Sequence, residues 1–148
     1  MKEIRDGKTV LITPVTDEDL ADLRIGDIVY LDGELATLRD SAHRRALSGV
    51  SMPVDLQGKA LYHAGPIVRP GPDGSWEMVS CGPTTSMRME RYEKDFLPLT
   101  GVKVIVGKGG MKEDTAEACR TYKAVHCVFP AGCAVVAAEK VEAVTGHF

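Results

Sequence analysis

The chain has 148 residues, 44% of them apolar and 26% charged, which is typical of a globular fold with one core. Its formal net charge of -3 argues against nucleic acid as the main partner, because phosphate binding needs a clustered basic excess. The sequence contains no apolar run of about 18 residues, and residues 1–6 lack the apolar region of a secretory signal. We therefore expect one cytoplasmic domain, residues 1–148, that does not bind a membrane.

The first third of the chain predicts one short helix and two strands. Thr16-Asp17-Glu18-Asp19 has the form of a capping box, and Gly26 is expected to end the helix that follows it. Strands are predicted at residues 27–31 and 34–38, and Asp32-Gly33 between them is a strong signal for a type I′ hairpin.

The middle of the chain predicts a short helix and then tightly connected β structure. Asp40 can cap a helix that runs through Leu47. Short strands are expected at residues 61–63, 67–68 and 76–79, and a cluster of proline and glycine at residues 70–74 indicates a turn before the last of them.

The second half predicts a parallel βαβ unit. Residues 102–106 are an apolar, mostly β-branched run, as expected for a strand that is buried on both faces. A glycine-rich turn, a helix at residues 113–122 and a second buried strand at residues 124–129 follow. The alanines of residues 131–143 favour a last helix.

The helix before this unit is predicted at residues 86–97, where Met89, Tyr92 and Phe96 recur at helical spacing. Pro98 and Gly101 are expected to end it.

The residues that lead into this helix, Gly82-Pro83-Thr84-Thr85-Ser86-Met87-Arg88, favour an anion site. Thr84 or Thr85 is suited to cap the helix, whose free N–H groups and positive dipole end attract anions. Arg88 lies four residues after Thr84, so both side chains are expected on one side of the first turn, where they can bind a carboxylate. An ordinary helix cap with a surface arginine fits the same residues.

Gly107-Lys108-Gly109-Gly110 follows a predicted parallel strand, where open α/β sheets bind their ligands. Gly107 and Gly109 allow the backbone to approach a ligand closely, and Lys108 supplies a charge. The segment matches neither a Walker A loop nor G-x-G-x-x-G, which argues against a nucleotide site. A flexible connection with an exposed lysine is the alternative.

Two further segments hold candidate side chains. Arg39 precedes the predicted helix at Asp40 and is the best placed of the local basic residues to reach a cleft, whereas His43 and its arginine neighbours mostly fit a solvated face. His63 lies beside a tight turn, and a hydrogen-bonded structural role has at least equal weight for it.

No residues of this chain form a recognisable metal site. The four cysteines, Cys81, Cys119, Cys127 and Cys133, contain no C-x-x-C pair and are expected to be mostly buried thiols. Basic groups that bind a substrate without a Lewis acid point to a partner that supplies one.

The segments resemble a known family when they are taken together. The residues 39–43, 62–66, 82–89 and 107–111 resemble, in this order, motifs of the β subunit of class I fumarase and of L(+)-tartrate dehydratase. The resemblance runs from about Lys2 to about Val141. Members usually continue past Val141 with an acidic stretch, so we expect either a compact variant or final strands that come from elsewhere.

The resemblance implies an α/β fold: a swivelling β/β/α domain with a mixed sheet that closes against an α subunit. That α subunit would hold a [4Fe–4S] cluster, the pair would form a dimer of heterodimers, and the reaction would add or remove water on a C4 hydroxy-dicarboxylate such as malate or tartrate. By position, Thr84 matches a catalytic base and Arg39, Arg88 and Lys108 match carboxylate-binding groups. Gly107 and Gly109 would line the substrate, with Thr85 and His63 as further candidates.

A function without catalysis is the alternative. The same basic groups would serve a stand-alone anion- or carboxylate-binding module that regulates a partner.

Overall fold

Four parallel strands form the central sheet of the computed structural model, which describes residues 1–148. The strands are β4 (Leu35–Thr37), β5 (Ala60–Tyr62), β8 (Val104–Gly107) and β9 (Val125–Val128), and they lie in the order β4-β5-β8-β9. Each neighbouring pair is parallel. The predicted βαβ unit is confirmed, with β8 and β9 joined through α4 (Glu113–Tyr122).

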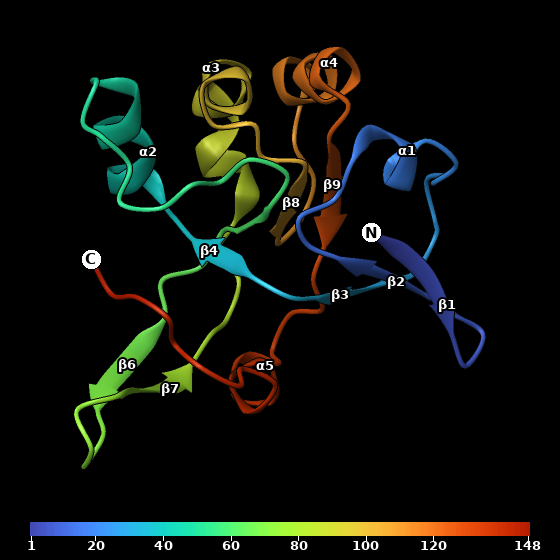
Figure 1. Cartoon of the computed structure of the whole chain (residues 1–148). Helices are drawn as coiled ribbons and strands as arrows, with labels where there is room; N and C mark the ends of the chain where they lie inside the picture. Colours follow the sequence, from blue (N-terminus) through green and yellow to red (C-terminus); the bar gives the residue numbers. More distant parts are fainter.

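Three helices cover one face of this sheet. They are α2 (Asp40–Leu47), α3 (Glu90–Thr100) and α4, which lie side by side in Figure 1. The side chains of Leu61 and Ile105 point from the sheet into a core with Phe96, because alternate strand residues face opposite sides. All three side chains are fully buried.

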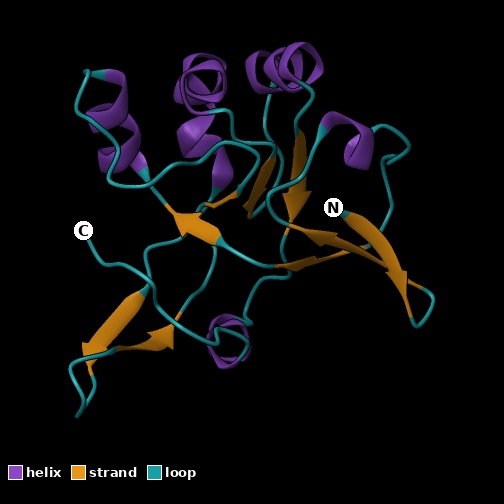
Figure 2. Ribbon diagram, in the orientation of Figure 1, coloured by secondary structure: helices purple, strands orange, loops and turns teal.

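The opposite face carries a second β layer and a short helix. A mixed sheet has the order β1-β2-β3 and contains β1 (Lys2–Arg5), β2 (Lys8–Ile12) and β3 (Val29–Asp32), with the single-turn helix α1 (Asp17–Leu20) beside it. The antiparallel hairpin of β6 (Ile67–Pro70) and β7 (Trp76–Ser80) and the helix α5 (Ala134–Glu139) complete this side (Figure 2). Ala60 and Val104 pack here against Leu11. The expected α/β class with a mixed sheet is confirmed.

The predicted hairpin at Asp32-Gly33 is wrong. β3 pairs with β2 and β4 pairs with β5, so the two strands belong to different sheets. Contacts with Thr13 hold the chain where it passes from one sheet to the other. A Cβ on Gly33 would lie 2.9 Å from the carbonyl oxygen of Thr13, and the Thr13 hydroxyl donates to the carbonyl oxygen of Glu34 at 2.5 Å. Local turn chemistry does not report such contacts.

Three helix boundaries also differ from the expectation. The capping box of Thr16 is confirmed, but α1 ends at Leu20 rather than Gly26, because the residues after Leu20 are mostly exposed and have no core to pack on. The N-cap of α2 is Arg39 and not Asp40. Only residues 134–139 of the predicted last helix are helical.

The predicted helix at residues 86–97 divides into two parts. A 3₁₀ turn, η1 (Ser86–Met89), precedes α3, which continues past Pro98 to Thr100 before Gly101 ends it in the left-handed region. Pro98 is tolerated because it is exposed in the last turn, and buried Phe96 and Leu97 hold that turn on the core. Among all helices, none has both the length and the apolar character that a bilayer crossing requires.

Candidate functional site

The carboxyl ends of the parallel strands gather most of the candidate segments at one edge of the sheet. Arg39 follows β4, His63 follows β5, and Lys108 follows β8. Because parallel strands end on the same side, these residues meet although they are far apart in the sequence. We call this side of the sheet the carboxyl edge.

The segment of residues 82–86 crosses the carboxyl edge. Pro83 forms a bridge with Ala64, and the Thr84 N–H donates to the carbonyl oxygen of His63 at 2.7 Å. Thr85 forms a parallel bridge with Lys108, and the Ser86 N–H donates to the Lys108 carbonyl oxygen at 3.0 Å. The structure therefore joins the two predicted anion-binding segments directly.

Arg39 extends across the end of β5. A Cβ on Gly65 would lie only 2.5 Å from the Arg39 guanidinium carbon, so the absence of a side chain at Gly65 makes room for this arginine. Arg39 is itself exposed. The expectation that Arg39 reaches toward a ligand site is consistent with this position beside the segment of residues 62–66.

Arg88 lies differently from the expectation. Thr84 is outside the helix, and Thr85 is the N-cap of a 3₁₀ turn without a side-chain cap hydrogen bond. The expected pairing of Thr84 and Arg88 on one α-helical turn is therefore wrong, and the Ser86 N–H that such a cap would offer is already used by Lys108. Arg88 instead pairs with the Asp40 carboxylate at 3.2 Å, at the rim of a hollow that carries charges of both signs.

Most of the candidate side chains at the carboxyl edge are open to solvent. Arg39, Thr85, Arg88 and Lys108 are exposed, and Thr84 is half-buried. Cationic groups on an open surface, rather than in an enclosed pocket, can hold an anion effectively only when another surface excludes water from them.

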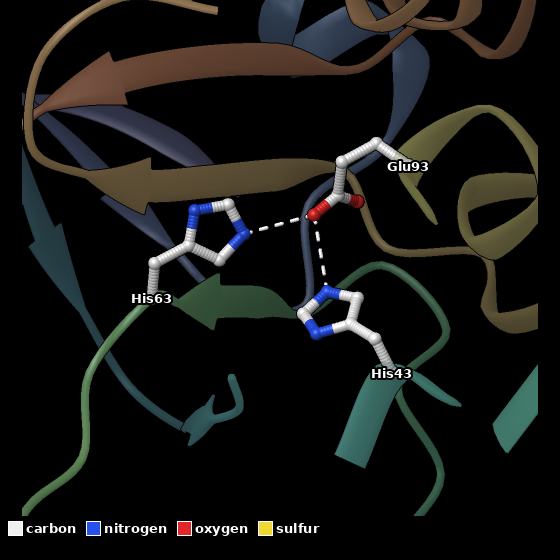
Figure 3. Close-up of side chains that lie close together, drawn as sticks. All are labelled: His43, His63 and Glu93. Atoms are coloured by element: carbon white, nitrogen blue, oxygen red, sulfur yellow. Dashed lines mark hydrogen bonds and ion pairs between the residues drawn. The ribbon is translucent and has the colours of Figure 1, made fainter. Parts of the chain in front are cut away.

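A buried polar cluster lies directly beneath these groups. One oxygen of the Glu93 carboxylate is 2.8 Å from His63 Nε2 and 3.1 Å from His43 Nε2, as Figure 3 shows. His63 Nδ1 lies 3.0 Å from the Ser86 hydroxyl. His43, His63, Ser86 and Glu93 are all fully buried, and we call these four residues the polar bridge.

The charge state of Glu93 follows from its partners. Burial alone would raise the pKa of this carboxyl, but the hydrogen bonds from His43 and His63 outweigh it and lower the pKa. Glu93 is therefore an ionised carboxylate at neutral pH although it is shielded from solvent.

The sequence analysis missed His43 and Glu93. The expectation that His43 belongs to a solvated face is wrong, since its ring packs between Tyr92 and Phe96. A signal was present: Glu93 lies four residues after Met89 and three before Phe96, which places a carboxylate on the apolar face of α3. A charge at such a position needs a buried partner.

The polar bridge also contains the one convergent set of metal-ligating side chains in the chain. Ligand atoms of His43, His63 and Glu93 lie within 4.8 Å of one another, and no cysteine belongs to the group. His63, a candidate for substrate contact, is thus a hydrogen-bonded buried residue below the carboxyl edge.

The four cysteines do not fit an iron–sulfur cluster. All are free thiols and no three of them converge; Cys81 is buried and the other three are half-buried. Burial raises the pKa of Cys81 and Cys127, and that of Cys119 to about 11, so these groups remain protonated. A cluster ligand is a thiolate, so the donor set for such a cluster is not in this chain.

Known proteins are similar in sequence to this chain over most of its length. The family model described as Fumarase C-terminus matches residues 2–146. The chain is 57% identical to the L(+)-tartrate dehydratase subunit beta of Escherichia coli (strain K12) over 136 residues, which are 91% of this chain and 67% of that protein.

Two more distant relatives extend the comparison. A putative L(+)-tartrate dehydratase subunit beta of Methanocaldococcus jannaschii is 43% identical over 134 residues, which are 88% of this chain and 68% of that protein. A putative fumarate hydratase class I of Geobacillus stearothermophilus is 37% identical over 136 residues, 92% of this chain but only 26% of that longer protein.

Proposed function

The chain belongs to the Fumarase C-terminus family, and on this premise we propose that it is the β subunit of a two-subunit hydro-lyase. Its reaction would add or remove water on a C4 hydroxy-dicarboxylate, as the names of its tartrate dehydratase and fumarate hydratase relatives indicate. The observation that carries the proposal is the convergence of Arg39, residues 82–86 and Lys108 at the carboxyl edge.

The cationic groups at this edge suit a substrate with two carboxylates. Arg39 and Arg88 carry planar guanidinium groups that bind a carboxylate through two parallel hydrogen bonds, and Lys108 provides a compact positive charge. Gly109 is exposed and leaves the backbone beside Lys108 accessible to the substrate, whereas Gly107, which was expected to line the substrate, is buried and faces Ser86 instead. We assign the carboxylate-binding role to the three cationic residues.

Arg88 is held weakly before substrate binds. Its side chain is 57% exposed and its guanidinium pairs with Asp40, and an exposed ion pair of this kind contributes only about 0–1 kcal/mol. A substrate carboxylate can therefore replace Asp40 at little cost. In this proposal Asp40 keeps Arg88 near the site until the substrate arrives.

We propose Thr84 as the group that exchanges a proton with the substrate. Its main chain is fixed by the hydrogen bond to the carbonyl oxygen of His63, and the residue is half-buried beside exposed Thr85. Thr85 is exposed on the neighbouring position and serves in this scheme as a second hydroxyl for substrate orientation.

The partner would be an α subunit that holds a [4Fe–4S] cluster. The relatives named subunit beta support a partner chain, and the open carboxyl edge offers it a cationic surface to cover. Since no cysteine set of this chain fits a cluster, the Lewis-acid chemistry on the substrate hydroxyl is assigned to the partner. A dimer of such heterodimers in the cytoplasm is part of the proposal.

Anaerobic reconstitution with the cognate α subunit tests this function. We expect dehydration of L-tartrate or L-malate, or hydration of fumarate, only when both subunits are present. Inactivity of a correctly assembled pair on every small hydroxy-dicarboxylate would refute the proposal. Arg88→Ala should raise KM by about ten- to a hundredfold, the loss of a charged hydrogen bond, whereas Arg45→Ala on the exposed side of α2 is the matched control.

Calorimetry on the isolated chain separates the proposal from a regulatory binding module. Half of a split site should bind tartrate or fumarate weakly when it is alone. Tight binding of a dicarboxylate without any partner, combined with inactivity of the pair, would favour the binding module.

A further inference from the structure

We propose that the polar bridge is a positioning device that fixes the spacing between Arg39 and Lys108, and thereby the length of the dicarboxylate that the site accepts. The inference rests on the proposed function and assigns a specificity role to residues that do not touch substrate. Its starting point is where the bridge ends: one end is hydrogen-bonded to the backbone of Arg39 and the other to the backbone of Lys108.

The bridge is continuous from one end to the other. His43 Nδ1 is 2.9 Å from the Arg39 carbonyl oxygen, and Glu93 joins His43 to His63. The Ser86 hydroxyl then contacts His63 and accepts the backbone N–H of Lys108 at 3.1 Å. These five contacts connect the helix that follows β4 to the loop that follows β8, across the intervening strand β5.

The partners of each ring nitrogen lead to a proposed arrangement of protons in the bridge. The Glu93 carboxylate is an acceptor, so His63 carries a proton on Nε2; in the proposed arrangement the Ser86 oxygen accepts from the Lys108 N–H and the Ser86 O–H donates to His63 Nδ1. The Arg39 carbonyl and the Glu93 carboxylate are both acceptors, so in the proposed bridge His43 donates from both nitrogens. A His43 that donates from both nitrogens carries a positive charge, which balances Glu93 in this proposal.

This proton arrangement favours hydrogen bonds over a bound cation. A metal needs the lone pairs of His43 Nε2 and His63 Nε2, and both atoms carry protons in the arrangement above. Each donor has one acceptor, so the arrangement is directional and leaves little freedom at either end.

Packing makes the bridge rigid at the Lys108 end. A Cβ on Gly107 would lie 1.7 Å from Ser86 Oγ and 3.1 Å from His63 Nδ1, so the glycine lets the strand end approach the bridge. All four side chains of the bridge are fully buried, and the surrounding core prevents compensating movement. A change in the bridge should therefore move the Lys108 backbone relative to Arg39.

Ser86→Ala tests the inference in the reconstituted αβ pair. We expect KM for the C4 substrate to rise about tenfold while kcat stays within about twofold, since ground-state and transition-state binding are lost together. A merely structural defect would lower the active fraction, and hence kcat, without changing KM. Inhibition constants of succinate and glutarate measure length selection directly: the ratio between them should fall several-fold in Ser86→Ala.

The control removes a buried hydroxyl outside the bridge. Thr115 is 2% exposed and bonds to Glu90, so Thr115→Val is a loss of the same kind at another place. It should leave the succinate-to-glutarate ratio unchanged. An unchanged ratio in folded Ser86→Ala, or an equal loss of selectivity in Thr115→Val, would overturn the inference.

A second variant covers the case in which Ser86→Ala does not fold. Glu93→Gln keeps an acceptor oxygen for both histidines but removes the charge, so His43 should lose its second proton and length selection should fall. Imidazole ¹⁵N chemical shifts of the wild-type chain alone should show His43 doubly protonated and His63 with its proton on Nε2. Another proton pattern, or a stoichiometric tightly bound divalent cation, would refute the bridge even where the αβ pair is active. The ¹⁵N chemical shifts test the bridge in the chain alone, so they remain informative if the proposed function fails.

Discussion

Gly65→Ala should disable Arg39 without weakening the fold. The new Cβ would lie 2.5 Å from the Arg39 guanidinium carbon, 2.7 Å from Nε and 2.9 Å from Nη1. Nonbonded carbons prefer about 3.5–4.0 Å, so the guanidinium must move by roughly 1 Å or more. The obstacle is the end of a flexible, exposed side chain, so it moves easily and the backbone does not.

Activity and stability should therefore separate in this variant. A displacement of about 1 Å of a group that orients the substrate can lower kcat/KM by up to a hundredfold. Gly65 does not have a positive φ, so alanine fits its backbone and the free energy of unfolding should change by less than about 1 kcal/mol. Steady-state kinetics of the reconstituted pair and urea unfolding of the chain measure the two effects.

A double-mutant cycle identifies the route of the effect. In an Arg39→Ala background, Gly65→Ala should cause no further loss, because the side chain that it displaces is absent. Gly71→Ala is the matched control, since its Cβ also meets a flexible side chain, that of Ser75, but in the turn between β6 and β7. Full activity of Gly65→Ala, or an equal loss with and without Arg39, would show that Gly65 does not position Arg39.

Three further predictions concern the layer beneath the site. Gly107→Ala should lower the free energy of unfolding by about 1–3 kcal/mol through overpacking against Ser86, and Ser86→Ala in the same chain should recover part of that loss. A double-mutant cycle measured by chemical denaturation that shows no such coupling would contradict the close approach of Gly107 to Ser86. Phe96→Ala should lower the free energy of unfolding by about 3–5 kcal/mol, because this fully buried ring packs on His43 and the sheet. Leu99→Ala, at a position that is 57% exposed, should lower it far less, and similar values for the two variants would contradict the burial of Phe96. The folded-state pKa of Glu93 lies below its ordinary 4.5, so the contribution of this carboxylate to stability is complete above 4.5 and is lost as the pH falls through the folded-state pKa. Urea unfolding across this acidic range should show that the free energy of unfolding depends less steeply on pH in Glu93→Gln than in the wild type. An unchanged pH dependence would count against an ionised Glu93.

Local patterns in the sequence were sufficient for the elements that carry the candidate site. The β-branched run before Gly107 and the helix after it fixed a parallel βαβ unit, since periodicity and crossover geometry leave few alternatives. The motifs at residues 82–89 and 107–111 indicated the family, which the comparisons confirmed. Thr84, Arg39 and Lys108 as substrate-contacting residues remain proposals.

Long-range packing decided what these patterns left open. Asp32-Gly33 has the residues of a hairpin turn, but the chain passes there from one sheet to the other. The hydroxyl of Thr13, which is 19 or more residues away in the sequence, holds it by hydrogen bonds to the carbonyl oxygens of Asp32 and Glu34. Arg88 pairs with Asp40, and does not lie beside Thr84, because a 3₁₀ turn takes the place of the expected first turn of α3.

The sequence by itself determined the class of fold, the family and the segments that meet at the carboxyl edge, because strand ends, glycines and basic residues are local signals. Only the tertiary structure decided that His43, Glu93, His63 and Ser86 form one buried hydrogen-bonded set below Arg39 and Lys108. Glu93 and His63 are 30 residues apart and Glu93 and His43 are 50 apart, so no local pattern pairs them. Their pairing arises because burial on a shared core obliges each of these polar groups to find a partner.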